Sequence, residues 1–153
     1  SIYHAAALSG FKDMATLNQQ LQLLTDDNKI ARYWAAVGLL SHEKASLMPH
    51  QSNLIKAIDD DYPPVSITAA AILYHHFGVD QAVSALKKYC MDDNMDVALM
   101  ALNYLLYTEN KTPFIETVQK VHKTPDRNYN VKAACMDFLG ILGLIENNTQ
   151  TEN

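Results

Sequence analysis

The stretch DDNKIARYWAAVGL, residues 26–39, has three counterparts further along the chain that align with it without a gap. They are residues 60–73, 92–105 and 126–139, so successive copies start 34, 32 and 34 residues apart. Each copy opens with Asp, carries Ala or Val five positions later, a small residue after four more, and Leu at its end. Repeats of this length with helical spacing inside them are typical of stacked helix pairs. The pattern therefore predicts how the chain is built, and it does not say what the chain does.

The repeat predicts the positions of the helices. The second helix of each pair is expected at residues 28–41, 64–77, 95–107 and 129–145, and the first helices at 12–24, 50–59, 80–91 and 112–122, after a leading helix near 2–9. Apolar or small residues recur at i, i+4, i+7 and i+8 in the second helices, which is the spacing of one buried stripe. The residues expected to lie deepest are Leu39, Leu73, Leu105 and Leu139.

We therefore predict an all-α fold, an α-α superhelix in the form of a short solenoid with about four helix pairs and a leading helix. The folded domain is expected to span residues 1–146, followed by a polar, frayed tail at 147–153. Gly10 and Gly78 stand where left-handed C-caps are expected, whereas Gly140 and Gly143 are expected inside the last helix, where they allow close packing.

The Asp that opens each repeat has a structural explanation. A carboxylate just ahead of a helix accepts N–H groups of the first turn and complements the helix dipole. The EF-hand pattern, with Gly at its sixth position and Glu at its twelfth, is absent. We interpret these residues as helix caps and not as calcium ligands: Asp26, Asp60, Asp92 and Asp126.

Charge and composition exclude several functions. The chain has 12 Lys and Arg against 17 Asp and Glu, a net charge of −5, and the acidic residues gather at the repeat turns. Nucleic-acid binding needs clustered basic residues, so it is not expected. There is no apolar run of about 18 residues and no leader pattern. The chain starts at Ser1 and enters a helical pattern directly, which we interpret as a piece of a longer protein with a missing N-terminal neighbour.

The residue types that usually carry chemistry are present without the necessary spacing. His75 and His76 are adjacent on a predicted helix, so their side chains diverge by about 100° and cannot chelate one metal ion by themselves. Cys90 and Cys135 have no ligand spacing and are expected to be small buried residues. No HExxH, GxSxG, P-loop or dinucleotide turn occurs. No metal site or catalytic site is predicted.

One face of the second helices remains a candidate for binding. In a solenoid, such an outward stripe lines a broad face on which a partner docks. Trp34 and Tyr107 are the best exposed candidates, because aromatic residues anchor interfaces, whereas Tyr33 and Tyr104 share repeat positions with apolar residues and are expected in the core. The candidate binding face comprises Trp34, Val37, Thr68, His75, Met100, Asn103, Tyr107 and Asp137.

The residues of the repeat also resemble those of a known family. In residues 26–40, Asp is followed by Ala-Arg and Ala-Ala, which resembles the HEAT-type signature. The runs RYWAAVGLL (32–40), AAA (69–71) and DVALMALNYL (96–105) are similar to the C-terminal HEAT-like extension of bacterial sulfatases of the arylsulfatase and heparan N-sulfatase (N-sulfoglucosamine sulfohydrolase) type. The resemblance covers about residues 2–145. Arg32 and Lys132 keep the basic residue of the repeat, but Ser66 and Ala98 do not, so an Asp–Arg ladder between repeats should be interrupted in the middle.

The resemblance implies that catalysis belongs to a separate N-terminal α/β domain. There, a Cys or Ser in a Cys/Ser-x-Pro-x-Arg motif becomes formylglycine beside a calcium ion. This chain lacks that motif, so no catalytic residue and no cofactor is carried over, and calcium is expected only in the catalytic domain of the parent. The implied parent is a periplasmic or secreted hydrolase of sulfate esters or sulfamates on sulfated glycans, with this domain packed on its catalytic domain. The alternative is an independent helical scaffold that binds a separate protein or peptide.

Overall fold

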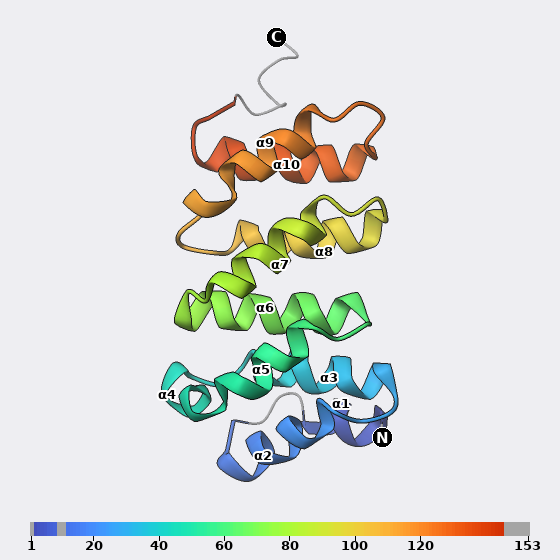
Figure 1. The fold of residues 1–153 in the computed structure, drawn as a ribbon, viewed down its shortest axis with the longest axis vertical. Helices are drawn as coiled ribbons and strands as arrows, with labels where there is room; N and C mark the ends of the chain where they lie inside the picture. Colours follow the sequence, from blue (N-terminus) through green and yellow to red (C-terminus); the bar gives the residue numbers. More distant parts are fainter. Residues whose placement is uncertain (1, 9–11, 146–153) are drawn as a thin grey trace. The chain divides into compact units, whose positions relative to one another are not determined.

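The computed structural model describes residues 2–8 and 12–145, and every regular element in these ranges is a helix (Figure 1). No strand occurs in the described ranges, which confirms the all-α prediction. The chain divides into two compact units, Ser1–Ala85 and Leu86–Asn153, which are treated separately below as unit 1 and unit 2.

Unit 1 is built around helix α3 (Lys29–Leu39). This helix packs against α1 (Ile2–Leu8), α2 (Met14–Leu23) and α6 (Pro63–Phe77). Between α3 and α6 the chain forms α4 (Lys44–Leu47), the 3₁₀ turn η1 (Met48–His50) and α5 (Gln51–Ile58), and α5 packs on α6. Helices α3 and α6 run in the same direction, as expected for equivalent members of successive pairs (Figure 1).

Unit 2 repeats this arrangement. Helix α7 (Asp80–Cys90) leads into it, followed by α8 (Met95–Leu106), the 3₁₀ turn η2 (Thr112–Phe114), α9 (Ile115–Lys123) and α10 (Tyr129–Ile141). Helix α10 packs against both α8 and α9, and α8 and α10 run in the same direction (Figure 1). The predicted helices are therefore confirmed to within a few residues at most ends, and the short helix α4 is the one that the periodicity did not predict.

The stripe that the repeat predicts forms part of the core. Leu39, Leu73, Leu105 and Leu139 are all essentially inaccessible to solvent, which confirms them as core residues. Burying a leucine side chain stabilises a fold by about 1.5–3 kcal/mol relative to leaving it exposed. The equivalent positions in α8 are less well covered, because Val97 and Tyr104 are only half-buried.

The capping prediction is wrong in its register by two residues. The N-caps of α3, α8 and α10 are Asn28, Asn94 and Asn128, whose side-chain oxygens accept N–H groups of the first helical turn. Asp26 and Asp92 instead accept the backbone N–H of the capping Asn, at 2.9 and 2.8 Å.

The other two Asp residues also lie outside the cap position. Asp60 accepts the N–H of Tyr62, the N-cap residue of α6, at 2.8 Å. Asp126 precedes α10 with a left-handed backbone, φ 63°. The carboxylates therefore shape the turn before the helix, and the residue two positions later begins the helix.

Two glycines show how the helices end. Gly78 has φ 61° and ends α6, which confirms it as a left-handed C-cap. Gly143 was predicted inside the last helix, and this is wrong: α10 ends at Ile141, Gly143 has φ 70°, and the N–H of Leu144 donates to the carbonyl oxygen of Leu139 at 2.9 Å. A residue with positive φ cannot continue a right-handed helix. Gly10 and the predicted tail at 147–153 lie outside the described residues.

Candidate binding surface

The turns of unit 1 are held together by Arg32. Its Nε and Nη2 atoms donate to the two carboxylate oxygens of Asp60 at 2.8 and 3.1 Å, and Nη2 also reaches Asp61 at 3.2 Å. Its Nη1 atom donates to the backbone oxygens of Asp26 and Asp27 at 3.0 and 3.2 Å. The Arg32 and Asp60 side chains are only 15% and 10% exposed. The hydrogen bond to Asp60 raises the pKa of Arg32 above its ordinary value.

The Arg32–Asp60 ion pair joins one repeat to the next, which is the kind of contact expected in an Asp–Arg ladder. At the equivalent position in α6, Ser66 donates its hydroxyl to the backbone oxygen of Ile58, within unit 1. At this position a serine with a bond inside unit 1 thus stands in place of the basic residue.

A cleft of about 450 Å³ opens beside this network. Its walls come from the end of α2, the turn at Asp26 and Asp27, and helix α5. Its lining includes Asn53 and Lys56 of α5 together with Arg32 and Asp60. The Arg32 donors are already engaged, so Lys56 is the cation that remains for a ligand. The cleft can therefore hold a polar group, and its lining includes no histidine or cysteine that would supply a base or a nucleophile.

The predicted face is only partly exposed in unit 1. His75 is exposed, and Trp34 and Val37 are half-buried, so Trp34 is less accessible than predicted. Thr68 is fully buried, and its hydroxyl donates to the backbone oxygen of Pro64 at 2.7 Å. The prediction that Thr68 lies on an outward face is therefore wrong. Every residue from Val65 to Leu73 is buried, so this part of α6 is covered on all sides.

The predicted face is well exposed in unit 2. Tyr107, the C-cap residue of α8, is 85% exposed. Ile141, which is not among the residues named for the predicted face, ends α10 and is 63% exposed. These two residues occupy equivalent repeat positions, and α8 and α10 pack together and run in the same direction. Asn103 and Asp137 are exposed as well, and Met100 is half-buried. We call the Tyr107 and Ile141 pair the α8–α10 patch; its role in binding stays a prediction.

The tyrosines expected in the core are only half-buried. Tyr33 lies on α3 beside Trp34, with 6.1 Å between their ring centres, and neither ring is fully covered. Tyr104 is half-buried on α8.

Three of the histidines, His42, His75 and His76, contact other side chains of the protein. His75 and His76 contact each other edge to face with 4.6 Å between their ring centres, and burial lowers the pKa of His76. His42 is buried, and its Nε2 lies 2.7 Å from the side-chain oxygen of Gln20, whose amide donates to the backbone oxygen of Leu8. Because the Gln20 oxygen is the acceptor, Nε2 of His42 carries the proton. Burial also lowers the pKa of His42.

The two cysteines are free and buried, as predicted. Burial raises the pKa of Cys90 to about 12 and that of Cys135 to about 11, with the charge of Arg127 acting in the opposite direction on Cys135. A thiol with such a pKa is a poor nucleophile at neutral pH. Within the described part of the chain, no three His, Cys, Asp or Glu side chains are grouped so that they could hold a metal ion.

Comparison with known proteins does not assign a family. No protein-family model matches this sequence, and no curated protein matches it significantly. Among the described helices, none has the length and apolar character needed to cross a bilayer.

Proposed function

We propose that this chain is a non-catalytic, HEAT-like helical-repeat module that docks a protein partner, and that the partner is the catalytic domain of a sulfatase in the same parent chain. The repeat of 34, 32 and 34 residues and the parallel equivalent helices inside each unit support the HEAT-like arrangement. The sulfatase partner rests on the resemblance of residues 32–40, 69–71 and 96–105 to the extension of those enzymes.

The observation that carries the docking proposal is the α8–α10 patch. Tyr107 and Ile141 expose large apolar side chains at the same end of two adjacent helices. Exposed aromatic and aliphatic residues that lie together are typical anchors of protein interfaces. The polar residues Asn103 and Asp137 on the same helices would form the rim of such an interface.

The non-catalytic assignment rests on the sequence. A sulfatase of the resembled type needs the Cys or Ser of the Cys/Ser-x-Pro-x-Arg motif, and no such motif occurs in the chain. Both thiols are also buried and held protonated.

The upstream reading frame gives the first test of the partner. We expect it to encode the Cys/Ser-x-Pro-x-Arg motif within an α/β domain. An upstream sequence without that motif would refute the sulfatase assignment and leave the independent scaffold, whose partner would be a separate protein. Hydrolysis of a sulfate ester or sulfamate by this chain alone would refute the non-catalytic assignment.

The patch is tested by binding of the separately expressed catalytic domain. The double variant Tyr107→Ala, Ile141→Ser should weaken that binding by about thirtyfold or more, because each truncated anchor removes roughly 1–2 kcal/mol. Tyr129→Ala is the matched control, since Tyr129 is 74% exposed at the opposite end of α10. If both variants bind as the unaltered chain does, the patch is not the docking surface.

A further inference from the structure

Unit 2 contains a buried arginine, Arg127, in which two of the three side-chain nitrogens have no hydrogen-bond partner in the described part of the chain. Arg127 lies in the turn between α9 and α10, and its side chain is only 11% exposed. Its Nη1 atom donates to the backbone oxygen of Asp92 at 2.8 Å. Its Nε and Nη2 atoms are inaccessible to solvent and have no hydrogen-bond partner among the described residues. Leaving charged donors buried and unsatisfied is costly, so such an atom pair calls for a partner.

Arg32 in unit 1 shows what this pair of atoms normally binds. In both arginines Nη1 is held by a backbone oxygen of a repeat turn. In Arg32 the Nε and Nη2 atoms grip the two oxygens of the Asp60 carboxylate. A guanidinium presents these two N–H groups in parallel, which matches carboxylate, sulfate and phosphate oxygens. Arg127 has the same two donors and lacks the carboxylate.

The nearest acidic side chain does not fill this role. Asp93 Oδ1 lies 3.8 Å from Nη1 of Arg127, on the side of the guanidinium that is already bonded, and the Asp93 side chain is fully exposed. An exposed ion pair of that length contributes little. The Nε and Nη2 side of the guanidinium is therefore not neutralised by this contact.

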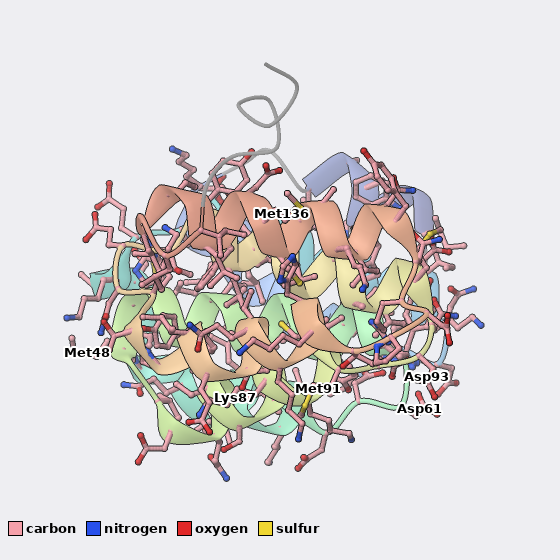
Figure 2. All side chains as sticks on the ribbon, turned by 90° about the horizontal axis from the view of Figure 1, so that it is seen from above. Met48, Asp61, Lys87, Met91, Asp93 and Met136 are labelled. Carbon is pink, nitrogen blue, oxygen red and sulfur yellow. The ribbon has the colours of Figure 1, made fainter. Side chains whose placement is uncertain are left out.

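A small cavity lies against the same residue. It has a volume of about 150 Å³ and is lined by Arg127, Lys120 and Thr124, with Met91, Asp93 and Val121 completing its wall. Met91 and Asp93, both labelled in Figure 2, lie on the segment between α7 and α8. Lys120 and Arg127 together outweigh the single negative charge of Asp93. The volume is well below the roughly 300–1,000 Å³ of sites for drug-sized ligands, so only a small anion fits.

We propose that Arg127 and Lys120 form a binding site for a small oxyanion, a group of the carboxylate, sulfate or phosphate type that accepts two parallel N–H bonds from Nε and Nη2 of Arg127. The ammonium of Lys120 supplies the second charge. Thr124, whose hydroxyl donates to the backbone oxygen of Lys120 at 2.8 Å, is another lining residue of the cavity. Because Nε and Nη2 are covered, binding requires a lining side chain to turn aside. Met91 and Lys120 are long, unbranched and exposed, which suits them to this movement. This site is independent of the proposed docking function.

The chain offers a built-in control, because it has only two arginines. The Nε–H signals of Arg32 and Arg127 can be followed by ¹H–¹⁵N NMR while sodium sulfate, phosphate or acetate replaces sodium chloride at constant ionic strength. We expect the Arg127 signal to shift and saturate, and the Arg32 signal, whose donors already bind Asp60, to stay in place. The three anions separate a preference for tetrahedral oxyanions from one for carboxylates. No saturable shift at Arg127, or equal shifts at both arginines, would refute the site.

Variants test the two cations separately. Arg127→Gln should weaken anion binding by about tenfold or more, as expected when two charge-assisted hydrogen bonds are lost. Lys120→Gln should weaken it by a few fold, while Lys123→Gln, on the same helix but outside the cavity lining, should leave it unchanged. If Arg127→Gln does not fold, Lys120→Gln and Lys123→Gln still decide the question. Equal affinities in those two variants would refute the assigned role of Lys120.

Discussion

Removing the Asp60 carboxylate should destabilise unit 1 far more than removing the equivalent carboxylate from unit 2. Asp60→Ala deletes two charge-assisted hydrogen bonds with Arg32, at 2.8 and 3.1 Å, and the bond to the N–H of Tyr62 at 2.8 Å. Asp92→Ala deletes only the bond to the N–H of Asn94, also at 2.8 Å. The two substitutions therefore share the loss of the turn bond and differ in the ion pair.

The magnitude follows from these bonds. A hydrogen bond to a charged group contributes about 1.5–3 kcal/mol, and breaking a buried ion pair from one side costs roughly 3–5 kcal/mol. Arg32 keeps its bonds to Asp61 and to the backbone oxygens of Asp26 and Asp27, which still compensate part of its charge. We therefore expect Asp60→Ala to lower the free energy of unfolding by about 3 kcal/mol, and Asp92→Ala by about 1 kcal/mol.

Urea unfolding can measure the two effects separately. The one tryptophan of the chain is Trp34, on α3, so its fluorescence reports on unit 1, while circular dichroism follows the helices of both units. Asp60→Ala should shift the fluorescence midpoint strongly, and Asp92→Ala should leave it nearly unchanged. A loss from Asp60→Ala that is no larger than the loss from Asp92→Ala would show that the Arg32–Asp60 pair does not hold the turns together.

Three further outcomes are expected. Because burial lowers the pKa of His42, the unfolded chain takes up the proton first, so the contribution of His42 to stability should be fully present above about pH 6.5 and fall on acidification below it. Urea midpoints at pH 7.5 and 5.5 measure this effect. A difference between the two midpoints that is equally large in His42→Gln would rule out His42 as its source. Gly78→Ala should lower the free energy of unfolding by about 1 kcal/mol, because alanine is strained at a φ of 61°. No atom lies within 4 Å of the added methyl, so a steric clash does not add to this cost. An unchanged melting temperature would contradict the prediction. Cys90 and Cys135, whose pKa values are raised to about 12 and 11, should react with a thiol reagent at pH 8 only after denaturation, and rapid labelling of the native chain would show that they are accessible.

The helices and their deepest residues could be predicted because both depend on local periodicity. The leucine at the end of each repeat lies in the core, and the second helices begin near the predicted positions. Helix α4 cannot be predicted from periodicity, because four residues are too few to show a helical period. The burial of Thr68 cannot be predicted for a different reason: α6 is covered on all sides, which depends on its neighbours and not on its own pattern.

The N-caps and Arg127 occupy repeat positions with a recognisable sequence signal. Asn28, Asn94 and Asn128 share one repeat position, and an Asn column is as strong a cap signal as the Asp column two residues before it. Arg127 occupies a position that is Asp in the other three repeats, so the repeat alignment by itself marks this arginine as an exception. Its unpaired donors could not be predicted, because they depend on which groups of other segments approach it.

The Asp-x-Asn turns have a consequence for how the chain folds. In the turns at residues 26–31 and 92–97, each side-chain bond joins residues only two or three positions apart. Contacts this local form with little loss of chain entropy, and they lower the barrier of helix nucleation that otherwise delays a new helix. Each unit thus carries its own initiation point, so α3 and α8 should begin to form early and on their own, without waiting for distant segments to collapse.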